Sequence, residues 1–237
     1  MAQVYAGTSG WAYPSWKPDF YPAKLASAKF LGFYATRLNT VEVNYTFRRF
    51  PTDRLLEGWI AATPPGFQFA VKAHQKITHI KRLRDVNEFT LDFIGSLRPL
   101  QEAKKLGPLL FQLPPFLKAD VSLLKDFLAI LPRGTRAAFE FRHVSWFSEE
   151  VFAALRAANA ALCEAESEKL ETPEAETADF SYFRLRKEEY SAKERKALAG
   201  KVAGRGKRGD VYVFFKHEDT PEGALHAEKL LEAAKGA

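Results

Sequence analysis

An acid, a guanidinium and an imidazole occur within four residues in the segment Ala137–Phe147. The segment begins with the alternation of a β-strand, so that Glu140 and Arg142 fall on one face and phenylalanines on the other. His143 follows where this alternation ends. Charged groups at the end of an apolar strand are costly to bury unless they are paired. The pattern therefore indicates either a structural Glu–Arg pair that closes a core or the rim of an active site.

The elements that would position these residues follow from the apolar periodicity, which predicts eight strands with helical patterns between nearly all of them. Such alternation implies parallel strands joined by right-handed crossovers. Eight units in 237 residues predict a (β/α)8 TIM-type barrel, and no polar linker divides residues 1–237, so a single domain is expected. No glycine-rich phosphate fingerprint follows the first strand, which argues against a dinucleotide-binding sheet. The predicted strands are residues 3–9, 39–45, 67–73, 109–113, 137–142, 160–166, 181–186 and 210–216.

One face of each predicted strand ends, at its C-terminal side, in a polar side chain. In a parallel barrel these side chains converge on the mouth or the upper lumen, where active sites of this fold lie. A purely structural lumen would be filled with valine, isoleucine and leucine instead. The polar side chains are Ser9, Glu42 with Asn44, Lys72, Gln112, Glu140 with Arg142, Glu164 with Glu166, Arg184 with Arg186, and Lys216.

This set predicts acid–base chemistry on a bound anion. Carboxylates, an amine and an imidazole can transfer protons, so catalytic roles are expected for Glu42, Lys72, Glu140 and His143. Cationic side chains at neighbouring strand ends suit a phosphate or a carboxylate. The residues expected to bind substrate are Ser9, Trp11, Asn44, Gln112, Arg142, Arg184, Arg186 and Lys216.

Two other chemistries stay open at these positions. Glutamates and histidines together could hold a divalent metal, although no tight His-Glu-x-x-His spacing specifies one. Lys72 could form a Schiff base, but pairing with Glu42 or Glu140 would keep its amine charged and argue against that role. Four histidines just beyond strand ends are candidate proton shuttles or metal ligands: His74, His79, His143 and His217.

Aromatic residues crowd the loops expected at the same mouth. Residues of this kind often only roof a barrel, but they can also stack on a sugar or a base. Both alternatives apply to Trp11, Tyr13, Trp16 and Trp146.

The net charge of +6 favours anionic partners. Much of this charge lies in the segment Lys187–Arg208, which is typical of a solvated helix and loop. Contact with nucleic acid is the minority alternative for this segment.

Some classes of protein are excluded by composition. No run of about 18 apolar residues predicts a membrane span, and no secretory signal is visible, so a cytoplasmic location is expected. A single cysteine, Cys163, excludes an internal disulfide and a cysteine-based metal cluster. Cys163 alternates with Leu162 and Glu164, so it is expected to face the helices as inert core.

Five motifs are spread over most of the chain: Gly7–Trp11, Asn39–Phe47, Phe69–His79, Gly107–Pro115 and Phe139–Trp146. Jointly they resemble the YecE-like family, also known as domain-of-unknown-function family 72. The resemblance implies a TIM-type barrel, in agreement with the strand count, and it brings no assigned activity with it.

The last third of the chain departs from the pattern of that family. Arg184-Leu185-Arg186-Lys187 stands where an Arg-Leu-His-Gly stretch is common, and Phe215-Lys216-His217-Glu218 where Phe-Asn-Asn-Asp is common. Both exchanges add charge at the expected mouth, so a more anionic ligand is expected for this branch.

Three functions remain from this reading of the residues. The favoured hypothesis is an enzyme that uses acid–base chemistry on a small phosphorylated or carboxylated substrate at the C-terminal mouth of the barrel. The alternatives are a metal-assisted phosphoesterase that acts on nucleic acid and a non-catalytic sensor of a small ligand.

Overall fold

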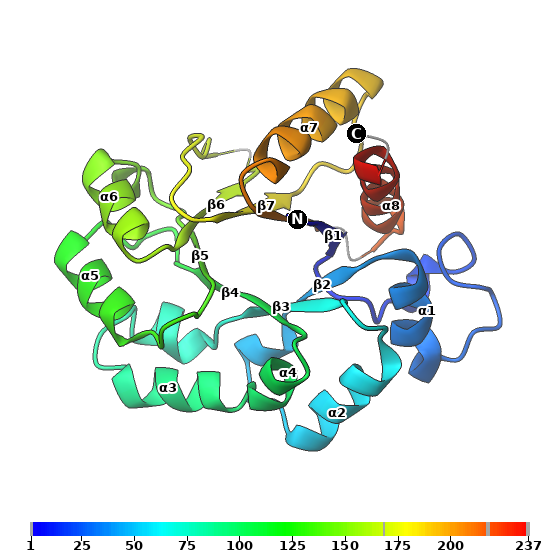
Figure 1. The fold of residues 1–237 in the computed structure, drawn as a ribbon, viewed down its shortest axis with the longest axis horizontal. Helices are drawn as coiled ribbons and strands as arrows, with labels where there is room; N and C mark the ends of the chain where they lie inside the picture. The colour runs from blue at the N-terminus through cyan, green and yellow to red at the C-terminus, as the bar shows by residue number, and fades with distance from the viewer. Residues whose placement is uncertain (1, 168, 217–218, 236–237) are drawn as a thin grey trace.

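The computed structural model describes residues 2–167, 169–216 and 219–235. Eight parallel strands form one sheet in the order β1-β8-β7-β6-β5-β4-β3-β2, which follows the chain around a ring. Figure 1 shows the helices arranged around the outside of these strands. The predicted (β/α)8 barrel is therefore confirmed. The strands are β1 (Val4–Thr8), β2 (Thr40–Val43), β3 (Gln68–Lys72), β4 (Leu106–Gln112), β5 (Ala137–Glu140), β6 (Ala161–Ala165), β7 (Phe180–Leu185) and β8 (Asp210–Phe215).

The helices connect successive strands, while the described residues between β6 and β7 form a long loop. Local chemistry fixes several helix starts, because Thr52, Asp120 and Ser148 each cap a helix with a side-chain oxygen. None of the helices formed by the described residues is long and apolar enough to cross a membrane. The helices are α1 (Phe30–Arg37), α2 (Asp53–Ala62), α3 (Asn87–Gly95), α4 (Arg98–Glu102), α5 (Val121–Ile130), α6 (Glu149–Ala157), α7 (Ala192–Gly206) and α8 (Glu222–Lys235).

Side chains help to close the barrel between β1 and β2. The Asn39 side chain, just before β2, donates to the carbonyl of Val4 at 2.8 Å and accepts from the amide of Ala6 at 3.0 Å. At the other end of the seam, the Ser9 hydroxyl donates to Glu42 at 2.7 Å. The seam therefore brings the end of β1 directly against a carboxylate of β2.

Gly7 allows this close approach. A Cβ atom at this position would overlap the backbone carbonyl of Thr40 on β2 and would lie 2.7 Å from the hydroxyl of Tyr34. That hydroxyl joins the two strands, because it accepts from the amide of Thr8 at 2.9 Å and donates to the carbonyl of Thr40 at 2.9 Å. Only glycine leaves room for this arrangement.

Two apolar cores lie on the two faces of the sheet. The larger one packs the outward faces of the strands against the helices, as expected for a barrel with a helical shell. The smaller one fills the lumen, and its buried members are Tyr5, Ala70, Leu110, Ala138, Ala161, Cys163, Phe180, Tyr182, Tyr212 and Phe214.

Strand β6 corrects the sequence-based prediction of which face points inward. Cys163 belongs to the lumen core, so the expectation that it faces the helices is wrong. Glu164 instead points outward, where it forms ion pairs of 2.6 Å with Lys201 and 2.7 Å with Arg205 of α7. Cys163 is nevertheless buried, as expected. Burial raises the pKa of its thiol well above the ordinary value, which makes the thiol unreactive.

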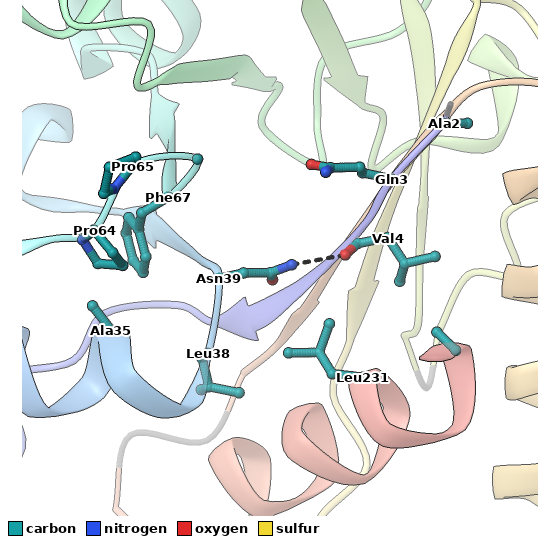
Figure 2. Close-up of a pocket in the computed structure, with 12 residues that line it drawn as sticks. Ala2, Gln3, Val4, Ala35, Leu38, Asn39, Pro64, Pro65, Phe67 and Leu231 are labelled. Carbon is teal, nitrogen blue, oxygen red and sulfur yellow. Dashed lines mark hydrogen bonds between the residues drawn. The ribbon is translucent and has the colours of Figure 1, made fainter. Parts of the chain in front are cut away.

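A cavity of about 470 Å³ lies at the N-terminal end of the strands (Figure 2). The described residues of its lining carry no charged side chain, and the polar side chains among them are those of Gln3 and Asn39. Both are engaged, since Gln3 accepts from the hydroxyl of Tyr5 and Asn39 holds the β1–β2 seam. Active sites of this fold lie at the opposite end of the barrel, and in the cavity of Figure 2 the Asn39 side chain is bonded to Val4 of β1.

Candidate active site

A buried charge cluster lies at the C-terminal end of the lumen. Arg184 on β7 bridges two carboxylates: its guanidinium contacts Glu42 of β2 at 2.8 Å and forms a second ion pair with Glu140 of β5. All three side chains are at most 2% exposed. Charges this deeply buried are tolerated because each one meets an opposite charge.

The oxygens of both carboxylates are fully engaged. Glu42 accepts from Ser9 and Arg184 on one oxygen and from the Tyr182 hydroxyl, at 2.7 Å, on the other. This tyrosine was not predicted as a site residue. Its inward position on β7 followed from strand parity alone.

Glu140 is held in the same way. One of its oxygens accepts from Arg184 and, at 2.9 Å, from the amide of Gln112, which the register of β4 and β5 sets directly opposite. The other oxygen accepts from Arg186 at 2.9 Å. Neither carboxylate therefore has an oxygen without a donor.

This environment keeps both acids ionised. Burial by itself would raise the pKa of Glu140, but the charges of Arg184 and Arg186 and the hydrogen bond from Gln112 lower it to about 2. Burial opposes ionisation of Glu42 too, and Arg184, Ser9 and Tyr182 overcome it, so the pKa of Glu42 is also lowered. A carboxylate held in this way is a poor proton donor and a weak base at neutral pH.

Lys72 ends β3 beside this cluster. Its amine donates to the Oε1 atom of Gln112 at 2.9 Å and lies 4.3 Å from the centre of the Phe47 ring. Burial, and next the positive charge of Arg184, lower the pKa of Lys72 to about 8. Lys72 is therefore the residue of the cluster whose proton is exchangeable near neutral pH.

A cavity of about 650 Å³ opens above the cluster at the mouth of the barrel. Seven of the eleven described residues that line it are cationic and none of these eleven is acidic, so this part of the wall attracts anions. The lining residues are Asn44, Tyr45, Phe47, Arg48, Arg49, Lys72, Gln112, Arg142, Arg184, Arg186 and Lys216.

The structure brings most of the predicted site residues to this place. The lining contains seven of them, while Glu42, Glu140 and Ser9 lie in the cluster beneath. The Oδ1 atom of Asn44 and the Nε atom of Arg186 are buried and have no hydrogen-bond partner among the described residues. Unsatisfied polar atoms beside a cavity are the groups that a bound ligand can satisfy.

Two predicted site residues belong neither to the described cavity wall nor to the buried cluster. His143 holds its own loop, because its Nδ1 atom is 2.8 Å from the hydroxyl of Ser145, which accepts in turn from the amide of Ala119. Trp11 packs edge-on against Trp59 of α2 at 5.3 Å. Neither side chain reaches the cluster in this arrangement.

The other predicted aromatic residues mostly belong to the packing of the loops. Trp16 and Trp146 are completely buried, and Trp146 stacks on Phe141 at 4.6 Å. The Tyr13 hydroxyl donates to the carbonyl of Ser9 at 2.8 Å. These three side chains therefore pack within the loops that cover the barrel.

The remaining histidines also have structural contacts. His74 accepts from the amide of Lys76 at 3.1 Å and packs on Phe89, and burial lowers its pKa. His79 is 2.8 Å from the hydroxyl of Thr78 and packs edge-on against Phe47 at 5.0 Å, so it supports the ring beneath Lys72. His217 lies outside the described residues.

Sequence reasoning missed the pair Arg48 and Arg49, which line the cavity after the helical turn Tyr45–Phe47. Among the described residues neither forms an ion pair, and Arg49 lies 5.5 Å from the centre of the Tyr45 ring. Two adjacent arginines, the first of them five residues beyond the end of β2, were the available signal.

Half of the eight basic side chains in the segment Lys187–Arg208 form ion pairs with acids. Lys187 pairs with Glu194 at 2.7 Å, Lys201 pairs with Glu164 at 2.6 Å, and Arg205 and Arg208 pair with Glu176. Such pairing is typical of a solvated helix.

A metal site is not found in the described part of the chain. No group of three or more His, Cys, Asp or Glu side chains there is arranged to hold an ion. The oxygens of Glu42 and Glu140 are taken by protein donors, and Glu164 points to α7.

Comparison with known proteins assigns the family. The profile described as "Protein of unknown function DUF72" matches residues 5–237. UPF0759 protein YunF of Bacillus subtilis (strain 168) is 36% identical over 155 residues, which are 61% of this chain and 52% of that protein. UPF0759 protein YecE of Escherichia coli (strain K12) is 29% identical over 147 residues, 62% and 51% of the two chains. The matches thus span about half the length of these relatives.

Solved structures share the whole barrel. A DUF72 family protein from Thermotoga maritima MSB8 superposes with a TM-score of 0.85 at 29% identity, covering 98% of this chain and 99% of that one. Another DUF72 family protein, from Enterococcus faecalis V583, superposes with a TM-score of 0.77 at 20% identity, and the match covers 98% of both chains. AP endonuclease, family 2, from Brucella melitensis superposes with a TM-score of 0.55 at 11% identity, covering 95% of this chain and 97% of that one. This is a likeness of fold alone. Because the family profile covers nearly all of the sequence, the chain belongs to the DUF72 family.

Proposed function

We propose that the protein is an enzyme that acts on a small phosphorylated or carboxylated molecule at the C-terminal mouth of the barrel. One observation carries this proposal: the described residues that line a cavity of about 650 Å³ include seven cations and no acid, and the cavity lies above a pair of buried carboxylates. A structural barrel has no need of such a cavity, since an apolar lumen would be more stable than a charged one.

The proposed roles follow from the state of each group. Arg48, Arg49 and Arg142 have no acidic partner among the described residues, so they are free to bind the anion by charge-assisted hydrogen bonds. Asn44 and Arg186 supply further polar atoms at the same wall. Binding by several cations at once would orient the substrate over the buried cluster.

Lys72 is the proposed proton-transferring group. Its amine reaches the cavity and has a pKa of about 8, so it exchanges a proton near neutral pH. Glu42 and Glu140 act in this proposal as positioning residues, because they stay ionised and hold Arg184 in place. His143 has no proposed role, since it binds its own loop.

A test of the anion site uses thermal unfolding in the presence of inorganic phosphate and a panel of phosphorylated and carboxylated metabolites. We expect ligands with at least one such group to raise the melting temperature, and we expect added salt to weaken the effect. The Arg142→Ser variant is expected to bind the best ligand about tenfold more weakly, the usual loss for one charge-assisted hydrogen bond.

Arg133 offers a matched control, because it is exposed and precedes β5 at the opposite end of the same strand. The Arg133→Ser variant removes the same charge and is expected to leave ligand binding unchanged. Equal weakening by both variants would mean that only net charge matters and would contradict a built site. Tight binding of a ligand that is never converted would favour the sensor, and binding of oligonucleotides alone would favour the nucleic-acid alternative.

A further inference from the structure

The contacts of Lys72 differ from those of the other cations in the buried cluster. Arg184 and Arg186 each bind a carboxylate, whereas the amine of Lys72 donates to a neutral amide oxygen of Gln112 at 2.9 Å. Among the described residues Lys72 forms no ion pair within 4.0 Å. The pairing that would keep its amine charged is therefore absent from this part of the chain.

Gln112 separates the amine from the acids. Its Oε1 atom accepts from Lys72 while its Nε2 atom donates to Glu140, so one side chain occupies the space between amine and carboxylate. The orientation of the amide is fixed, because an ionised Glu140 can only accept. Glu140 in turn has its remaining contacts with Arg184 and Arg186, and Glu42 with Arg184, Ser9 and Tyr182.

The surroundings make the neutral amine more common than in an ordinary lysine. Burial and the positive charges of Arg184 and Lys216 lower the pKa of Lys72, and together they outweigh the carboxylates of Glu42 and Glu140, which raise it. With a pKa of about 8, about a quarter of the Lys72 amines are neutral at about pH 7.5, against about one in a thousand for an ordinary lysine. A desolvated lysine beside other cations is a recurring form of activated nucleophile.

We propose that Lys72 is a nucleophile that forms an imine with an aldehyde or ketone carrying a phosphate or carboxylate group. This inference rests on the proposed anion site, because the cations of the cavity would hold the substrate's charged group while its carbonyl meets the amine. The substrate class is thereby narrowed from anions in general to anionic carbonyl compounds.

The step balances without a cofactor. The neutral amine adds to the carbonyl carbon, the C–N bond forms, and one amine proton moves to the oxygen to give a carbinolamine. The C–O bond then breaks, and the oxygen leaves as water with that proton and one further proton from solvent. The product is a protonated imine, which withdraws electrons from the neighbouring carbon and eases loss of a proton or breakage of a C–C bond there.

Reductive trapping tests the proposal with pyridoxal 5′-phosphate as the probe, an aldehyde that carries a phosphate. The full-length protein is mixed with the probe, reduced with borohydride and digested, and labelled peptides are measured by mass spectrometry. Among the chain's nineteen lysines we expect Lys72 to be labelled at least about tenfold faster than any other, given its neutral fraction. Inorganic phosphate should protect it.

Two variants make the result specific. Lys72→Arg keeps the cation but cannot form an imine, so labelling at this position should vanish while stabilisation by phosphate remains. Lys76→Arg is the control, since Lys76 also lies over a phenylalanine ring, that of Phe89 at 4.2 Å, but is not part of the cavity lining. In this variant Lys72 should be labelled at the same rate as in the native chain.

The outcomes separate this inference from the proposed function. Labelling spread evenly over surface lysines, with phosphate still stabilising the protein, would overturn the imine and leave the anion site standing. A second outcome is that pyridoxal and pyridoxal 5′-phosphate label Lys72 equally fast and that phosphate gives no protection. Lys72 would then be a reactive amine without an anion site, and the proposed substrate class would be wrong.

Discussion

Replacing Arg184 by methionine is expected to lower the free energy of unfolding by about 3 to 5 kcal/mol at neutral pH. The guanidinium is the shared partner of Glu42 and Glu140, and all three groups are removed from water. Methionine fills much of the same volume but leaves two buried carboxylates without their main counter-charge. The measurement is urea unfolding followed by circular dichroism, with the native chain as reference.

The loss should depend on pH in a definite direction. In the native chain Glu140 has a pKa of about 2, below its ordinary value, so its ionised form stabilises the fold above about pH 4.5, and this stabilisation disappears as the pH falls towards about 2. In the Arg184→Met variant the same two carboxylates, when ionised, destabilise the fold because they are buried without a counter-charge. The difference between variant and native protein should therefore be largest at neutral pH and should shrink in acid.

A rescue variant distinguishes charge from shape. Adding Glu42→Gln and Glu140→Gln to Arg184→Met removes the unpaired charges, and we expect most of the lost stability to return. If the triple variant is no more stable than Arg184→Met alone, the loss comes from packing around the long side chain, and the account of a charge-balanced cluster is wrong.

Gly7→Ala is expected to destabilise the barrel by about 3 kcal/mol, at the upper end of the cost of overpacking. The added methyl group would overlap the backbone carbonyl of Thr40, which cannot move aside as a flexible side chain could. β1 and β2 would have to separate, and the bond from Ser9 to Glu42 lies on the same seam. We therefore expect lower stability together with weaker binding of phosphate.

Gly58 provides the matched control for this change. It lies within α2, where a Cβ atom would meet nothing within 4 Å. The Gly58→Ala variant should be slightly more stable than the native chain, by about 0.5 to 1 kcal/mol, because alanine suits a helix interior better than glycine. Equal stability of Gly7→Ala and the native chain in urea unfolding would contradict the close approach of β1 to β2.

The fold could be predicted from the sequence because its signals are local and repeated. The strands alternate between two faces, several are preceded or followed by glycine or proline, and helical periods lie between most of them. Strand ends such as Gln112 and Arg184 could then be assigned to one mouth by parity, without knowledge of their partners.

The same rule failed at β6, where the pattern is ambiguous. Ala161, Cys163 and Ala165 are small enough for the lumen, while Glu164 looked like one more inward acid. Its outward position depends on Arg205 and Lys201, which lie far along the chain on α7 and provide the charges that a buried acid requires. No local pattern contains that information.

The pairs that the charged residues of the site form could not be predicted from the sequence either. Parity indicated that Glu42, Glu140, Lys72 and Arg184 would meet, but it could not indicate which acid would bind which base. The structure gives both carboxylates to Arg184 and a neutral amide to Lys72. The proposed chemistry rests on that distribution, because the pKa of the amine is lowered to about 8 while both acids stay ionised.

The central claim is that Lys72 is an amine of lowered pKa in an anion-binding cavity, and its titration tests this most directly. In protein with ¹³C-labelled lysine, the Lys72 side-chain signal, assigned by its loss in Lys72→Arg, can be followed from about pH 6 to about pH 11 by NMR. The account predicts a midpoint at about 8 and a change in this midpoint when phosphate is added. A midpoint at the ordinary lysine value, unaffected by phosphate, would contradict it.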